Sequence, residues 1–303
     1  MNPSQMFSRR QFFSLSATLG AGAVLASCGG GSGSGIGASQ DVLAGLDGSL
    51  QIAKRFSPES IIPGKVRLPI SLADKSGVLS TEGKVTLPDE LSAKIIDSET
   101  RDIVLKSVTA RRYDENMPVP YWPFVFNIEK EGIYILTLDI APETEISFQV
   151  LNRSDVPMPK VGDPLPPFDT PTVDNARGVN PICTRPEGTC PFHSMTLTEA
   201  LKSGQPVVYL IGTPAYCSTG TCAPGLDALI KISKTLKNKA VFIHADVYTD
   251  KTATEAAPAV QAYKLSYEPL LYITDAQGTQ IDRLDVIFDA KELREVLAAA
   301  GIS

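Results

Sequence analysis

Residues 207–222 read VVYLIGTPAYCSTGTC and decide the fold of the C-terminal half. Five consecutive apolar residues, 207–211, are typical of a strand that is buried on both faces of a sheet. Apolar residues at helical spacing follow over positions 226–236, which predicts an amphipathic helix. The two cysteines of this stretch, Cys217 and Cys222, are therefore expected where a buried strand leads into a helix.

Strands and helices continue to alternate from this stretch to the C-terminus. The expected elements are a buried strand over 240–245, a helix over 251–263, strands over 270–273 and 279–284, and a last helix that Asp289 and Glu292 open as a capping box and that ends at Gly301. The order strand, helix, strand, helix, strand, strand, helix predicts an α/β domain. Its crossover connections are expected to make the central sheet largely parallel.

This element order and two prolines resemble the thioredoxin-like superfamily over residues 162–303. Pro224 is expected in the second turn of the helix that follows the cysteines, and Pro269 stands directly before the third strand, where thioredoxins carry a cis-proline. Residues 161–172 are also similar to the leading segment of membrane-tethered thioredoxin-like and peroxiredoxin-like proteins.

The resemblance implies a thiol-disulfide oxidoreductase that works through a mixed disulfide. Cys217 would be the nucleophile and Cys222 the resolving thiol. Pro269, with Tyr216 and Glu268, would shape the substrate groove.

The spacing of the two cysteines departs from the thioredoxin pattern, because four residues separate Cys217 from Cys222 where thioredoxins have two. A thiol at a helix N-terminus still lies at the positive end of the helix dipole, which favours its thiolate. Residues five apart in an unbroken helix share a face poorly. Gly220 is expected to loosen the first turn and let the two sulfurs meet.

Two other kinds of function remain open from the sequence. Peroxiredoxins of the bacterioferritin-comigratory type also use four-residue spacing, but they place a threonine three residues before the reactive cysteine, whereas Thr213 lies four before Cys217. Sco-type copper proteins need a histidine on a later loop, and none follows His244. The alternatives are therefore a peroxiredoxin-like thiol peroxidase and a non-catalytic binding lipoprotein with structural disulfides only.

A second cysteine pair, Cys183 and Cys190, has no place in a standard thioredoxin. In an exported protein it predicts a disulfide that closes an eight-residue loop and stabilises by about 2 to 3 kcal/mol. The alternative is a second dithiol that relays electrons to Cys217 or Cys222. His193 would promote a thiolate there or cap the next helix.

No metal and no cofactor are predicted from the sequence. His193 and His244 are the only two histidines, which is taken to exclude a multi-histidine site, and His244 is expected to be structural within its strand. The spacings of the two cysteine pairs do not match common zinc-knuckle patterns.

The stretch from about residue 46 to 153 predicts an antiparallel β-sandwich, immunoglobulin-like in its architecture. Turn signals separate about seven short strands, expected over 50–56, 66–72, 84–87, 93–97, 124–128, 133–140 and 146–151. Residues 154–168 are rich in proline and predict a semi-rigid connector that separates the two domains.

The first residues predict export and lipid attachment. Arg9 and Arg10 precede an apolar run over 15–25, as in twin-arginine signals, and residues 25–28 read LASC, which resembles a bacterial lipobox with Cys28 as the lipidated residue. Residues 1–27 are then a signal peptide and 28–45 a flexible Gly/Ser tether.

The expected location is extracytoplasmic, with the protein anchored by lipid to the cell membrane on its periplasmic side or outer face. Its expected partners are protein thiols and disulfides at the membrane surface. The formal net charge of −6 disfavours nucleic acid as a partner.

Overall fold

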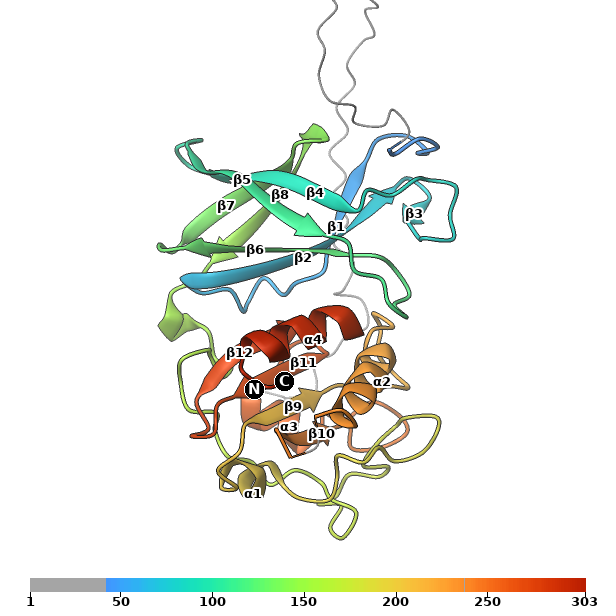
Figure 1. Ribbon diagram of the computed structural model, residues 1–303, viewed down its shortest axis with the longest axis vertical. Coiled ribbons are helices and arrows are strands. Elements are labelled where there is room, and N and C mark those ends of the chain that lie inside the picture. The colour runs from blue at the N-terminus through green and yellow to red at the C-terminus, as the bar shows by residue number, and fades with distance from the viewer. Residues whose placement is uncertain (1–41, 237) are drawn as a thin grey trace, which may run out of the picture.

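The computed structural model describes residues 42–236 and 238–303, and in them the chain is rich in β-structure, with three four-stranded sheets and few helices. Two sheets form the N-terminal half, and the third sheet with the helices forms the C-terminal half (Figure 1). Arg9, Arg10 and Cys28 lie outside the described residues, so their predicted roles remain predictions. Among the helices described, none is long and apolar enough to cross a membrane.

The N-terminal half packs two antiparallel sheets against each other. One has the order β1-β2-β3 with β6 also paired to β2, and the other has the order β5-β4-β7-β8. The strands are β1 (Gln51–Lys54), β2 (Gly64–Asp74), β3 (Gly77–Val78), β4 (Glu90–Asp97), β5 (Ile103–Arg111), β6 (Trp122–Ile128), β7 (Gly132–Leu138) and β8 (Ala141–Val150). Their inward side chains, such as Leu68, Leu136 and Trp122, form one core between the sheets.

Two strand predictions in this half are wrong. Residues 84–87 form no strand, and β5 (Ile103–Arg111) was not expected. Strand β5 lies at a sheet edge and is exposed along most of its length, so it lacks the apolar alternation that marks a half-buried strand.

The C-terminal half is built around a sheet with the order β10-β9-β11-β12. Its elements are α1 (Leu197–Leu201), β9 (Val207–Ile211), α2 (Cys222–Ser233), β10 (Val241–Ala245), α3 (Pro258–Tyr263), β11 (Leu270–Thr274), β12 (Gln280–Asp285) and α4 (Ala290–Ala299), and a 3-10 turn, Arg153–Asp155, precedes them. The predicted order of strands and helices from residue 207 onward is present.

The prediction of a largely parallel sheet is wrong, because only β10 and β9 are parallel, whereas β11 is antiparallel to both β9 and β12. Ala245, at the end of β10, and Leu270, at the start of β11, both lie beside Ile211. The connection between β10 and β11 therefore begins and ends beside the C-terminal end of β9. Its one helix, α3, is six residues long rather than the thirteen expected over 251–263.

The proline-rich residues 154–168 do not hold the halves apart. Val156, Met158 and Leu165 are buried in the core of the C-terminal half, and Arg283 bonds to the carbonyls of Pro159 and Ser60. The segment packs onto that half instead of spanning a gap.

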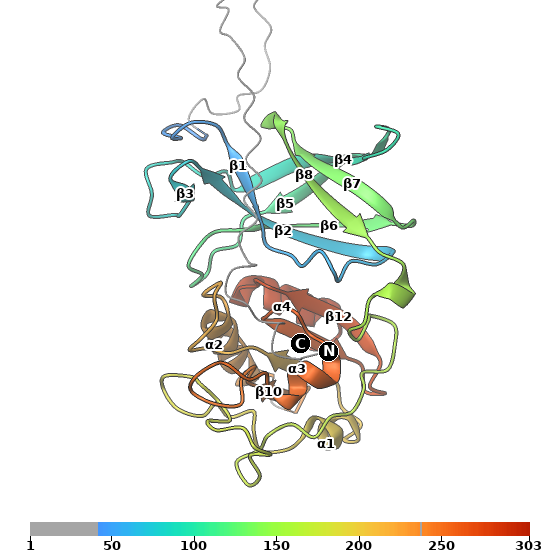
Figure 2. The ribbon, with the colours of Figure 1, turned by 180° about the vertical axis from the view of Figure 1, so that it is seen from behind.

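Helix α4 lies against strands β2 and β6 of the N-terminal half (Figures 1 and 2). Arg67 of β2 donates from Nε and Nη2 to the two carboxylate oxygens of Glu292, each at 2.7 Å, and the Tyr121 hydroxyl donates to the same carboxylate at 2.6 Å. Glu292 therefore does not complete the predicted capping box. Asp289 alone caps α4, accepting from the Glu292 backbone N–H at 2.8 Å.

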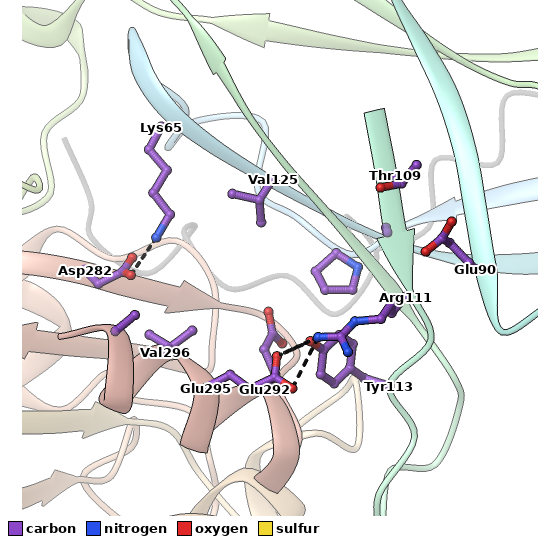
Figure 3. Close-up of a pocket in the computed structure, with 13 residues that line it drawn as sticks. Lys65, Glu90, Thr109, Arg111, Tyr113, Val125, Asp282, Glu292, Glu295 and Val296 are labelled. Carbon is purple, nitrogen blue, oxygen red and sulfur yellow. Dashed lines mark hydrogen bonds and ion pairs between the residues drawn. The ribbon is translucent and has the colours of Figure 1, made fainter. Parts of the chain in front are cut away.

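A cavity of about 370 Å³ opens beside this contact, between the two halves. Figure 3 shows ion pairs that border it, Lys65 with Asp282 at 2.6 Å and Arg111 with Glu295 at 3.3 Å. Tyr113 also donates to Glu295 at 2.6 Å. The junction thus has a buried ion pair at Glu292 and more exposed ion pairs around it.

Candidate functional site

The loop between β9 and α2 folds back and carries Cys217 over the start of the helix. The Cys217 N–H donates to the Thr213 carbonyl at 3.1 Å, and the Gly220 N–H donates to the Cys217 carbonyl at 3.1 Å. Gly220 has φ +69°, a left-handed conformation that glycine adopts without strain. The sulfurs of the two cysteines, which are five positions apart, lie within 4.8 Å of each other.

Cys217 does not start the helix, which corrects the sequence prediction. Helix α2 begins at Cys222, so Pro224 lies in its first turn, not its second. The Cys217 sulfur nevertheless faces the helix N-terminus, since the backbone N–H groups of Thr221 and Cys222 stabilise its thiolate. The positive end of the helix dipole therefore favours the Cys217 thiolate although this residue lies outside the helix.

The two thiols are free and unlike each other. The interaction with the Cys222 side chain is the main cause that lowers the pKa of Cys217 to about 5, and the Thr219 hydroxyl, 3.1 Å from the Cys217 sulfur, lowers it further. Burial raises the pKa of Cys222, which is 1 % exposed. Cys217 is partly exposed, so it is the thiol that can react with an outside molecule.

Glu268 and Pro269, the residues expected to shape the groove, lie beside Cys222. The peptide bond between them is cis. The Glu268 carboxylate accepts from the Thr213 N–H at 2.6 Å and from the Cys222 thiol at 3.4 Å. Burial, and after it the negative charge of Cys217, raises the pKa of Glu268 well above its ordinary value.

The end of β9 comes close to both α2 and β11 at Gly212. A Cβ added there would lie 3.3 Å from Cβ of Pro269 and 3.4 Å from Sγ of Cys222. Tyr216 packs the edge of its ring against Tyr248, with ring centroids 6.1 Å apart. The structure thus places Glu268 and Pro269 against the dithiol and gives Tyr216 an aromatic partner outside that group.

The N-terminal half reaches the rim of the dithiol loop. A Cβ on Gly220 would lie 3.8 Å from Cγ of Pro118, which belongs to the segment between β5 and β6. A second hollow, of about 420 Å³, lies between this segment and the first turn of α2, where Glu115 and Asn116 face Pro224. A molecule that approaches Cys217 therefore meets surface from both halves.

A second cluster lies deeper in the C-terminal half and brings Cys183, Cys190, His193 and His244 together. All four are at most 5 % exposed, and their ligand atoms lie within 4.8 Å of one another. Cys183 and Cys190 are free thiols here, not the predicted disulfide. The prediction from the sequence considered the histidines and the cysteines separately, whereas the structure brings two of each together as four possible donors.

Sequence reasoning missed this cluster because it treated each histidine alone. Cys183, Cys190 and His193 fall within eleven residues, which is a usable signal, but His244 lies 51 positions further on. The backbone brings His244 to that loop, since the His244 N–H donates to the Phe192 carbonyl at 3.2 Å. His193 does not cap α1, since Thr196 does so in a reciprocal capping box with Glu199.

The two clusters are joined by the loop that begins at Cys183. The Thr184 N–H and hydroxyl donate to Asp246 at 2.8 and 2.7 Å, and its Oγ1 lies 3.0 Å from Oγ1 of Thr213. The Ala215 N–H donates to the same Thr184 oxygen at 3.3 Å. The Cys183 loop thus supports the loop that carries Cys217.

Comparisons of this chain with protein-family models, with curated proteins and with solved structures gave no match. The functional assignment therefore depends on the chemistry of the two clusters.

Proposed function

We propose that the chain is a thiol-disulfide oxidoreductase whose C-terminal half is thioredoxin-like and whose redox pair is Cys217 and Cys222. One observation carries the proposal: the partly exposed Cys217, whose pKa is lowered to about 5, has its sulfur within 4.8 Å of the sulfur of the buried Cys222. Disulfide exchange needs an accessible thiolate to attack the partner and a second thiol next to it, shielded from solvent, to resolve the mixed disulfide.

The reductive direction proceeds in two steps. The Cys217 thiolate attacks one sulfur of a partner disulfide, so the partner's S–S bond breaks, a mixed disulfide forms, and the departing partner thiolate takes a proton from water. Cys222 then loses its proton and attacks the Cys217 sulfur. The Cys217–Cys222 disulfide forms, the second partner thiol leaves, and two electrons have passed to the partner.

Glu268 is the group placed to take the proton of Cys222, because its carboxylate already accepts from that thiol at 3.4 Å. Formation of the mixed disulfide removes the negative charge of Cys217, which after burial is the largest cause that raises the pKa of Glu268. The carboxyl then ionises more readily, while burial keeps it more basic than an exposed glutamate. Glu268 is thus poised to act as base when the second step begins.

The N-terminal half is proposed as an immunoglobulin-like spacer and docking module. The approach of Pro118 to Gly220 supports a docking role, because it brings the N-terminal half to the edge of the dithiol loop. The twin-arginine and lipobox residues support a location outside the cytoplasm, with Cys28 anchored in the membrane. The partners would then be protein disulfides near the membrane surface.

Trapping of the mixed disulfide tests the proposal. In the full chain carrying Cys28→Ala, the further change Cys222→Ser should leave a stable adduct with a disulfide-containing test peptide, and Cys217→Ser should abolish it. Peptide mapping by mass spectrometry should place the adduct on Cys217.

The control is the parent Cys28→Ala chain, which should reduce the peptide and accumulate little adduct. Failure of Cys222→Ser to trap any adduct, or a Cys217–Cys222 reduction potential below about −300 mV, would favour a purely structural pair. Rapid formation of sulfenic acid on Cys217 with hydrogen peroxide, without peptide reduction, would favour the peroxidase alternative.

A further inference from the structure

The buried cluster of Cys183, Cys190, His193 and His244 has the dimensions of a metal centre. The Nε2 atom of His193 lies 3.1 Å from Nδ1 of His244, and Sγ of Cys190 lies 3.5 Å from the same Nδ1. In a tetrahedral zinc site, Zn–N bonds of about 2.0 to 2.1 Å and Zn–S bonds of about 2.3 Å separate two nitrogens by about 3.3 Å and a nitrogen from a sulfur by about 3.6 Å. The two observed separations match these values closely.

The outer nitrogen of each histidine is held by a backbone carbonyl. Nδ1 of His193 lies 3.2 Å from the Pro171 oxygen, and Nε2 of His244 lies 2.9 Å from the Gly212 oxygen. A carbonyl oxygen only accepts hydrogen bonds, so these two ring nitrogens carry the protons. The inner nitrogens, Nε2 of His193 and Nδ1 of His244, then hold lone pairs.

Two lone pairs that face each other at 3.1 Å need a positive species beside them. A histidine that binds a metal typically donates its other N–H to a backbone carbonyl or carboxylate, which fixes its tautomer and orientation. Both histidines of this cluster have that arrangement. The four donors are at most 5 % exposed, so a bound ion would be enclosed.

We propose that Cys183, Cys190, His193 and His244 bind one zinc ion in a closed structural site. Two sulfur and two nitrogen donors in a tetrahedral arrangement are the set that zinc prefers. Two thiolates and one Zn²⁺ also sum to no net charge, which avoids an uncompensated charge in a buried place. The site leaves no position for substrate, so its role is to hold the Cys183 loop against the sheet.

The proposed ion also lies behind the redox loop. Gly212 accepts from His244 and contacts the position of Cys222, and Thr184 next to Cys183 bonds to the loop that carries Cys217. Zinc would therefore fix the backbone at Gly212 and in the loop that carries Cys217. The proposal does not depend on what the dithiol does.

Zinc content and cobalt substitution test this site. The full chain carrying Cys28→Ala, purified under reducing conditions without chelator, should hold one zinc per chain by mass spectrometry. Co²⁺ in place of zinc should give the visible absorption of a tetrahedral site together with thiolate charge-transfer bands. Cys183→Ser and His244→Gln each remove a ligand, so each should weaken zinc binding by more than the roughly 10- to 100-fold that loss of a hydrogen-bond partner of a ligand costs.

The matched control is Cys217→Ser, because in the part of the chain that the structure describes Cys217, Cys222 and Glu268 form a separate group of donors within 4.8 Å of one another. It should keep the zinc and the cobalt spectrum unchanged. Loss of zinc in Cys217→Ser would overturn the proposal, and so would a reduced parent chain that binds no zinc at micromolar concentration.

A nitrogen-15 NMR measurement keeps the proposal testable if a ligand variant fails to fold. The chain has only two histidines, so their ring signals can be assigned directly. In the zinc-loaded chain, His193 should be protonated at Nδ1 and metal-bound at Nε2, and His244 should be the reverse. A proton shared between the two rings, unchanged by zinc, would refute the site.

Discussion

Glu292 of helix α4 offers a direct test of what holds the two halves together. Replacing it with glutamine keeps the shape and an acceptor for the Tyr121 hydroxyl but removes the negative charge. Arg67 would then be a buried cation, with its side chain 10 % exposed and no carboxylate beside it at 2.7 Å. The change should therefore be costly.

The magnitude follows from burial. Removing one partner of a buried ion pair costs about 3 to 5 kcal/mol. Arg67 keeps the carbonyls of Asp285 and Ile287 as acceptors, at 3.1 and 2.6 Å, which favours the lower end of that range. We expect the free energy of unfolding to fall by about 3 kcal/mol.

Urea unfolding followed by tryptophan fluorescence measures the effect. Trp122 is the one tryptophan of the chain and is fully buried in the N-terminal half, so it reports the loss of that core. Far-UV circular dichroism follows the helices of the C-terminal half at the same time. If α4 couples the halves, both signals should shift together.

Glu295→Gln is the matched control, since it makes the same change one turn along α4. Its partner Arg111 is 59 % exposed on its side chain, and such surface pairs contribute about 0 to 1 kcal/mol. Equal losses in the two variants, or a loss below about 1 kcal/mol for Glu292→Gln, would contradict the reasoning. The double change Arg67→Met with Glu292→Leu should recover part of the stability, because neither position then leaves an unpaired buried charge.

Three further outcomes are expected. The rate of Cys217 alkylation by iodoacetamide should reach half its maximum near pH 5. The lowered pKa of Cys217 keeps the reactive thiolate populated above that pH, and the thiolate is protonated only below it. A midpoint near the ordinary cysteine pKa of about 8.5 would contradict this. Glu268→Gln should slow the second step of exchange, measured as longer-lived mixed disulfide, and leave the alkylation of Cys217 at saturating pH unchanged. Gly225→Ala should lower the free energy of unfolding by about 1 to 3 kcal/mol, measured as a lower urea midpoint, because the added Cβ would lie 3.1 Å from the Phe288 ring. An unchanged midpoint would show that the ring can move.

Local patterns predicted much of this chain. Five consecutive apolar residues correctly marked β9, which is buried along its whole length. Asp289 was correctly identified as a helix cap, and the places of Glu268 and Pro269 beside the cysteines were also foreseen. Each of these features depends on neighbours in sequence or on spacing along one element.

The predictions that were wrong depend on contacts between residues far apart in the sequence, which spacing along the chain does not encode. The direction of β11 is set by where the chain returns to the sheet. The Glu292 carboxylate binds Arg67, which is 225 positions away, and does not complete the expected capping box. The cysteine and histidine cluster likewise needs a strand and a loop to meet. Local propensity gives no information about such partners.

The contact of α4 with the N-terminal half also limits how these halves can be exchanged. Arg67 and Tyr121 both converge on Glu292, so part of the interior of the molecule is shared between them. A C-terminal half transplanted onto an unrelated carrier would bring a buried carboxylate without its counter-charge. Recombination at the proline-rich segment would therefore be tolerated only if the new carrier supplied an arginine at the same place. We expect the two halves to be retained together for this reason.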